Sequence, residues 1–316
     1  MINHFITNKK ILLILCFCIS LLFVITGCDR LTQQNKQNSN KSQTKAGIKK
    51  TQVYSNIMEI NSDLIDIMSQ VDLIPYYEKQ IKEKEKEEKD KEKKQQKQSQ
   101  QGGQGGQQES SEGPSAGGGE SSSGGGSGGG KEEFKPKPVT INDILLSKVL
   151  EQEKSYQTEQ SRERKIPDDI ISIWHEVNTK ISDLHQKWDG LKPKLKKIDI
   201  PEDKTADFEN TLNDLTIAST NNKFLETLKQ ANKTTSFIPS FIEKSKDKTS
   251  ASMYEIKYHV RQMLLDAANN KENLEDKIKK IKEAEKTISK KLEKQDEKEL
   301  SQKITSSIDN LKKAIT

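Results

Sequence analysis

Apolar side chains recur at alternating spacings of four and three residues in several parts of this sequence. One such stripe lies at 53–71, and others lie at 170–188, 260–292 and 300–315. This spacing places the apolar side chains along one face of an α-helix. Few stretches show the two-residue alternation of a strand, so the sequence predicts an all-α protein.

The composition argues against one large compact core. Hydrophobic residues make up 31% of the 316 residues and aromatic residues only 5%, whereas 32% are charged. Helical bundles joined to disordered segments suit such a chain. The 53 basic and 48 acidic residues nearly cancel, and the lysine clusters are not interleaved with aromatic residues. We therefore expect no nucleic-acid partner.

The N-terminus has the layout of a bacterial lipoprotein signal peptide. Lys9 and Lys10 precede an apolar run from residue 11, which closes on Ile25-Thr26-Gly27-Cys28. We predict a signal peptide over 1–27 and lipidation (palmitate) of Cys28, the first residue of the mature chain. A plain secretory signal or a short membrane anchor is the alternative, although the run is near the lower limit of about 20 residues for a spanning helix.

This assignment also accounts for the three cysteines of the chain. Cys16 and Cys18 would leave with the signal peptide, and Cys28 would carry the lipid. The mature chain would then have no free thiol, which excludes a disulfide framework and a cysteine-ligated zinc site.

Composition changes divide the rest of the chain into five parts. Fourteen of the 17 glycines lie between 102 and 130, mixed with Ser, Gln and Glu, which is typical of a flexible linker. The predicted order is a disordered tether (28–49), an amphipathic helix (50–74) ended by Pro75, a charged Lys/Glu/Gln segment (75–101), a Gly/Ser-rich flexible linker (102–139) and an α-helical bundle domain (140–316). The 50–74 helix either packs on the bundle or lies apart.

We expect the bundle domain to be elongated, with about five or six helices. Pro167, followed by two aspartates, starts one helix, and Gly190 and Pro193 should stop it. The expected segments are 140–162, one from 167, one from about 201, a short one near 224–228, an apolar connector at 237–242, a long helix at 250–294 that Asn269-Asn270 kinks or splits, and a last helix at 298–315.

No pattern in the sequence indicates catalysis, a metal or a cofactor. The three histidines of the mature chain, at 175, 185 and 259, lack ligand spacing and are expected at the surface or at its boundary. No nucleophile motif or phosphate-binding loop is present, so we expect a protein that is not an enzyme. Trp174 and Trp188 fall on the inward stripe, so core packing is expected for both. Core packing is likewise expected for Tyr254 and Tyr258, which lie beside the long stripe.

The layout resembles the outer-surface lipoproteins of Borrelia spirochaetes. The run from Glu83 to Lys97, followed by Gln-Gly-Gly-Gln-Gly-Gly at 101–106, is similar to the spacer of the OspE/F-related (Erp and Elp) group. The resemblance implies a protein anchored in the outer membrane through Cys28 and displayed on the cell surface. It also implies a host protein as partner, such as a complement component or regulator or a matrix protein.

Two other functions stay open from the sequence. A periplasm-facing lipoprotein could scaffold envelope proteins through an exposed heptad stripe. An envelope enzyme would need a deep pocket lined with convergent polar groups. The oligomeric state does not follow from the sequence.

Overall fold

The computed structural model describes residues 13–22, 24–25, 45–101, 137, 139, 143–154, 166–269 and 274–315. The chain divides into two units, one made of residues 1–78 together with 139–316 and the other of residues 79–138. The first unit is a helical bundle, and no strand occurs in the described ranges. The all-α prediction is confirmed.

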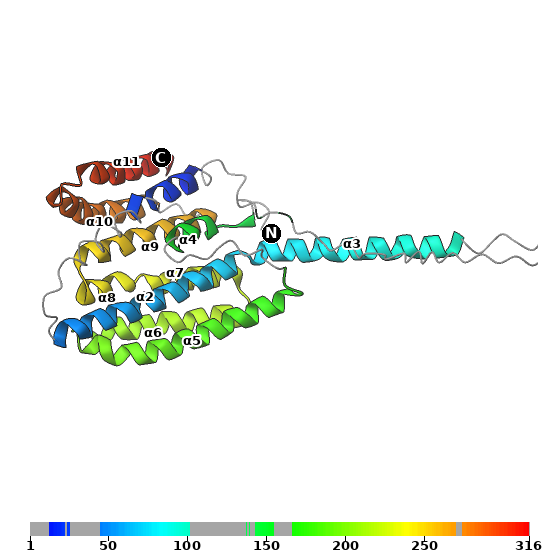
Figure 1. Ribbon diagram of the computed structural model, residues 1–316, viewed down its shortest axis with the longest axis horizontal. Helices are drawn as coiled ribbons and strands as arrows, with labels where there is room; N and C mark the ends of the chain where they lie inside the picture. Colours follow the sequence, from blue (N-terminus) through cyan, green and yellow to red (C-terminus); the bar gives the residue numbers. More distant parts are fainter. Residues whose placement is uncertain are drawn as a thin grey trace, which may run out of the picture. The chain divides into compact units, whose positions relative to one another are not determined.

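The bundle consists of helices from both sides of the glycine-rich region (Figure 1). From residue 140 onward the described residues form eight helices rather than the five or six expected. These eight helices are α4 (Ser147–Lys154), α5 (Ile170–Lys196), α6 (Glu202–Thr220), α7 (Phe224–Thr235), α8 (Ile238–Ser245), α9 (Lys248–Ala268), α10 (Leu274–Lys294) and α11 (Lys298–Ile315). The bundle helix that precedes the glycine-rich region is α2 (Lys45–Asp72).

Two features account for the larger number of helices. The apolar connector expected at 237–242 is the start of the short helix α8, with Pro239 in its first turn, where a missing N–H costs no intrahelical bond. The stripe expected as one long helix is split, because α9 ends at Ala268 with Asn269 as its C-cap, and α10 starts at Leu274. The sequence allowed either a kink or a split at Asn269-Asn270, and the structure has the split.

The prediction that Gly190 and Pro193 stop a helix is wrong. Helix α5 starts at Ile170 rather than at Pro167, and its N-cap is Asp169, whose carboxylate accepts a hydrogen bond of 2.7 Å from the N–H of Ser172. It then continues through both residues to Lys196. Leu191 and Leu195 lie beyond the expected stop and are at most 1% exposed. Burial of these two leucines offsets the cost of the proline in the last turns.

Helix α2 packs on the bundle, which answers the question that the sequence left open. Its apolar stripe is almost completely buried, from Val53 at 4% exposure to Val71 at 0%. The helix contacts α5, α7, α8 and α4. Lys187 of α5 pairs with Glu59 at 3.0 Å and Asp63 at 2.7 Å, so charged contacts flank the apolar ones. The helix starts at Lys45, earlier than expected, and ends at Asp72, before Pro75.

A buried carboxylate at the end of α2 caps the start of α4. The N–H groups of Leu145, Leu146 and Ser147 donate to Asp72 at 2.9, 2.9 and 2.6 Å, and the Ser147 hydroxyl donates at 2.6 Å. Asp72 is 0% exposed. Burial raises its pKa, and the four donors act in the opposite direction. A residue more than 70 positions away thus satisfies the N–H groups that a helix start leaves free.

The second unit, residues 79–138, is therefore an insertion between two touching helices of the bundle. Helix α3 (Ile74–Gln101) runs into it. Within the unit, the N–H of Lys137 donates to Gln80 Oε1 at 2.8 Å, and its ammonium pairs with Glu83 at 3.1 Å. These contacts join the two ends of the insertion. The charged segment at 75–101 is helical in the structure, whereas residues 102–136 of the predicted linker lie outside the described residues.

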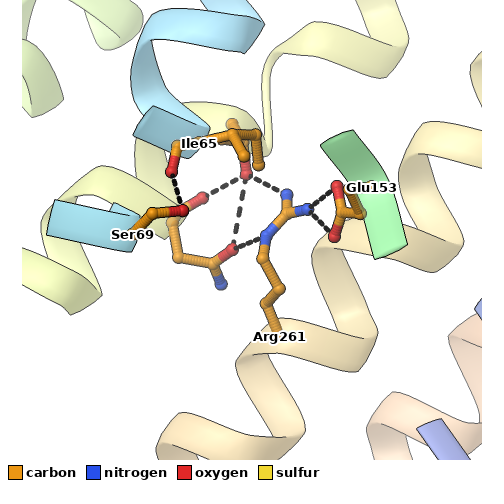
Figure 2. A network of polar contacts seen from close by, with 6 residues as sticks. Ile65, Ser69, Glu153 and Arg261 are labelled. Carbon is orange, nitrogen blue, oxygen red and sulfur yellow. Dashed lines mark hydrogen bonds and ion pairs between the residues drawn. The ribbon is translucent and has the colours of Figure 1, made fainter. Parts of the chain in front are cut away.

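A buried ion pair holds the other end of α4 (Figure 2). Arg261 of α9 is 2% exposed and donates through Nη1 to both carboxylate oxygens of Glu153 at 2.6 Å. Its Nε donates to Asn232 Oδ1 and its Nη2 to Thr235 Oγ1, each at 2.8 Å, and both acceptors belong to α7. Because every nitrogen of the guanidinium has an acceptor, the buried charge is compensated.

We predict that breaking this ion pair strongly destabilises the bundle. The Arg261→Met variant leaves Glu153 buried without its cation, which should lower the free energy of unfolding by about 3–5 kcal/mol. Urea denaturation measures the change. The double variant Glu153→Met/Arg261→Met should recover most of the loss, and Lys196→Ala, which breaks the exposed pair with Glu202, should have little effect. A double variant no more stable than Arg261→Met would contradict this.

A second prediction concerns the insertion. If a specific protease site replaces Gly117–Gly119, cleavage should leave the two fragments associated, because α2 lies in one fragment and α4 to α11 in the other. Gel filtration in buffer should show one species of unchanged size, and electrophoresis in denaturant should show two chains. Separation of the fragments in buffer would show that the contacts of α2 are too weak to hold the bundle together.

Candidate protein-interaction surface

Two isoleucines of the bundle point into solvent. Ile171 is 76% exposed and Ile217 is 59% exposed, and Leu13 is the third large apolar side chain with high exposure in the described ranges. Single exposed apolar residues are common on protein surfaces, whereas neighbouring ones indicate contact sites. The position of each isoleucine in the bundle therefore decides how the pair is interpreted.

Helices α5 and α6 run antiparallel, which brings the two isoleucines to the same end of the pair. The Ser219 hydroxyl donates to Asn178 Oδ1 at 2.7 Å, and His185 Nε2 lies 2.9 Å from Thr216 Oγ1. The start of α5 therefore lies beside the end of α6. Ile171 is two helical turns before Asn178, and Ile217 directly follows Thr216.

Three half-buried apolar residues lie at the ends of neighbouring helices. Ile170 at the start of α5, and Phe224 and Leu225 at the start of α7, pack against the core but keep part of their surface exposed. We call Ile170, Ile171, Ile217, Phe224 and Leu225 the α5–α6 patch. An exposed apolar group of this kind at one end of a bundle suits a protein partner better than a small ligand.

The two tryptophans do not contribute to this surface. Trp188 is 1% exposed and stacks on Phe208 with ring centroids 4.0 Å apart, and Phe241 lies on the same cluster at 6.0 Å. Trp174 is 5% exposed. The prediction that both belong to the core is confirmed. Tyr254 is also buried, whereas Tyr258 is half-buried.

The histidines lie where the sequence places them, and they do not converge. His175 is exposed, and His185 and His259 are half-buried. In the part of the chain that the structure describes, no group of three or more His, Cys, Asp and Glu residues is arranged to hold a metal ion. Cys28, the one predicted site residue, lies outside the described residues.

The bundle also has an open hollow of about 540 Å³ between α7, α9 and the start of α10. Its two carboxylates accept amide hydrogen bonds, Glu226 from Gln230 at 2.6 Å and Asp266 from Gln262 at 2.9 Å. Among the described residues that line it, no nucleophile is hydrogen-bonded to a base. The hollow thus lacks the arrangement that would favour the envelope-enzyme hypothesis.

No protein family, curated protein or solved structure matches this chain. No helix among the described residues is long and apolar enough to cross a membrane.

The α5–α6 patch could not be recognised from the four-three stripes of the sequence. Ile170 was assigned to the inward stripe of α5, while Ile171 and Ile217 are off the stripes of their helices. Apolar residues that break the four-three spacing were therefore the available signal. Such residues become informative only when the contacts between helices show that they share one end of the bundle.

Stability of the bundle should fall between pH 6.5 and pH 4 because of His259. Burial, and then Lys277 and Lys280, lower its pKa to about 4, and Glu283 acts in the opposite direction. Glu255 lies 4.0 Å away on the same helix. A histidine whose pKa is lowered in the folded state stabilises the fold above pH 6.5, and this contribution is lost as the pH falls through 4.

The loss should reach about 3 kcal/mol in the free energy of unfolding for a shift of this size. Urea denaturation at pH 7, 5.5 and 4 measures it, with His259→Gln as the comparison. Carboxylates titrate in both proteins, so the difference between the two curves isolates His259. Parallel curves over this range would contradict the assignment.

Proposed function

We propose that this protein is a lipid-anchored envelope protein of bacteria whose helical bundle binds a host protein at the cell surface without catalysis. The leader and Cys28 support the anchor. The observation that carries the binding role is the α5–α6 patch, where Ile171 and Ile217 expose 76% and 59% of their surface at one end of the bundle. The resemblance to Borrelia surface lipoproteins supports a host complement or matrix protein as the partner.

The fold of the chain determines which segment can separate the bundle from the membrane in this proposal. A flexible linker at 102–139 could hold a domain away from the membrane, but helices on both sides of it belong to the bundle. The spacer in this proposal is the polar stretch at 29–44, between Cys28 and α2. A flexible chain of 16 residues spans about 20–25 Å on average. The bundle would then lie closer to the membrane than a spacer of the whole region 28–139 would place it.

The periplasmic scaffold remains the alternative function, on weaker grounds. It was based on an exposed heptad stripe, and the stripe of α2 is buried against other helices of the bundle. The two proposals differ in where the protein is displayed. Protease treatment of intact cells separates them, since only a surface-displayed bundle is accessible.

Mass spectrometry and a binding experiment test the proposal. The mature protein should start at a lipidated Cys28, and serum or matrix proteins should bind to the bundle in a pull-down. The double variant Ile171→Asp/Ile217→Asp should lose at least about tenfold in affinity, because a buried apolar anchor contributes over 1 kcal/mol. Gln186→Asp, an exposed change on the same helix, is the matched control.

Two outcomes would contradict the proposal. An unmodified Cys28 thiol in the mature protein would remove the anchor. Equal binding of a host partner by the patch variant and by the control would remove the patch as the binding surface, provided that both variants keep the thermal unfolding midpoint of the wild-type protein.

A further inference from the structure

The apolar segment at the N-terminus is part of the bundle core. Its two described stretches, 13–22 and 24–25, are helical, and we call them the leader helix. Side chains at three- and four-residue spacing are at most 4% exposed and belong to the same core cluster as residues of α9, α10 and α11. These buried side chains are Ile14, Leu15, Cys18, Leu21, Leu22 and Ile25.

Most of the other apolar side chains of the leader helix also contact the bundle. Phe17, Ile19 and Val24 are partly buried and pack against the core, whereas Leu13 and Cys16 are exposed. A signal peptide acts through its apolar segment, which has to leave water for the membrane. Because the same side chains cannot face lipid and the bundle core at once, docking on the bundle and entry into the membrane exclude each other.

The burial of α11 indicates which surface receives the leader helix. Ile304, Ile308 and Leu311 are 0–1% exposed, yet α10 is the helix with which α11 makes extensive contact among those labelled in Figure 1. Two packed helices leave the edges of their interface open to water, so such complete burial indicates a third apolar element. Figure 1 draws the leader helix, in dark blue, next to α10 and α11.

The two sides of this contact are synthesised at different times. The leader helix precedes α11 by roughly 270 residues, which take on the order of 10–60 s to synthesise at about 5–20 residues per second. During this interval the leader helix lacks part of the surface on which it docks. Only a chain that has been synthesised through α11 and has folded can bury it completely.

We propose that the folded precursor masks its own leader. A chain that folds before export buries the leader helix in the bundle, and the leader then no longer enters the membrane. This step rests on the proposed function, in which residues 1–27 direct export and are cleaved before Cys28. It adds a condition to that function, because the leader has to reach the membrane before α11 packs.

Two cysteines of the leader helix report on docking within one molecule. Cys16 is exposed, whereas Cys18 is 0% exposed and burial raises the pKa of its thiol. The thiolate is the reactive form, so Cys18 should react with iodoacetamide at least about tenfold more slowly than Cys16 in the folded full chain. In denaturant the two rates should be similar. Both cysteines lie in the tryptic peptide 11–30, and fragmentation of this peptide in a mass spectrometer locates the label.

Flotation with vesicles of phosphatidylethanolamine and phosphatidylglycerol tests whether docking masks the leader. The folded full chain should stay unbound, whereas the same chain diluted from urea directly into vesicles should float with them. Ile308→Asp places a charge in the buried contact and should raise the bound fraction of the folded full chain at least about fivefold. Ser306→Asp, an exposed change on the same helix, is the matched control and should stay unbound.

A further control attributes flotation to the leader. Residues 29–316 with Ile308→Asp should stay unbound, because this chain has the same altered bundle but no leader helix. Flotation of this chain would show that a loosened bundle, rather than an unmasked leader, binds the vesicles, and it would contradict the proposal.

The outcomes also separate this inference from the proposed function. Equal alkylation of Cys16 and Cys18 in the folded chain would show that the leader helix is not docked. Flotation of the folded wild-type chain, or equal flotation of the Ile308→Asp and Ser306→Asp variants, would show that docking does not mask it. If the labelling and flotation results are as expected but protein isolated from cells carries an unmodified Cys28, the masked leader remains and the proposed anchor fails.

Discussion

The bundle depends on one buried carboxylate, which joins helices from the two sides of a long insertion. Asp72 closes α2 and satisfies the N–H groups at the start of α4. A carboxylate without water is unfavourable unless donors surround it, and here three N–H groups and one hydroxyl do so. Glu153 and Arg261 fix the other end of the same short helix. Helix α4 has only eight residues, so these tertiary contacts rather than its own propensity hold it in place.

This arrangement changes the meaning of the glycine-rich region. From composition, the region looks like a spacer between an anchor and a working domain. Because α2 packs on α5, α7 and α8, the region instead starts and ends at the same body. In the proposed anchored form, its length would have little influence on how far the bundle reaches from the membrane. Loops of this kind can be long, since the entropy of closing them grows only slowly with length.

Helix identity could be predicted from the sequence because it depends on local spacing. The four-three stripes at 53–71 and 170–188 lie within the helices that they specify, α2 and α5. Prediction was wrong where the burial of apolar side chains outweighed a local stop signal. Gly190 and Pro193 are such a signal, and helix α5 continues through both. Lipidation of Cys28 stays a prediction, since that residue lies outside the described part of the chain.

The sequence by itself determined that the chain is helical, where most of the helices lie, and that both tryptophans are buried. Only the tertiary structure decided which stripe covers which. A stripe such as that of α2 carries no information about its partner, because apolar burial is non-directional and many faces could satisfy it. For the same reason, the exposure of Ile171 and the burial of Leu21 followed from packing between segments far apart in the sequence.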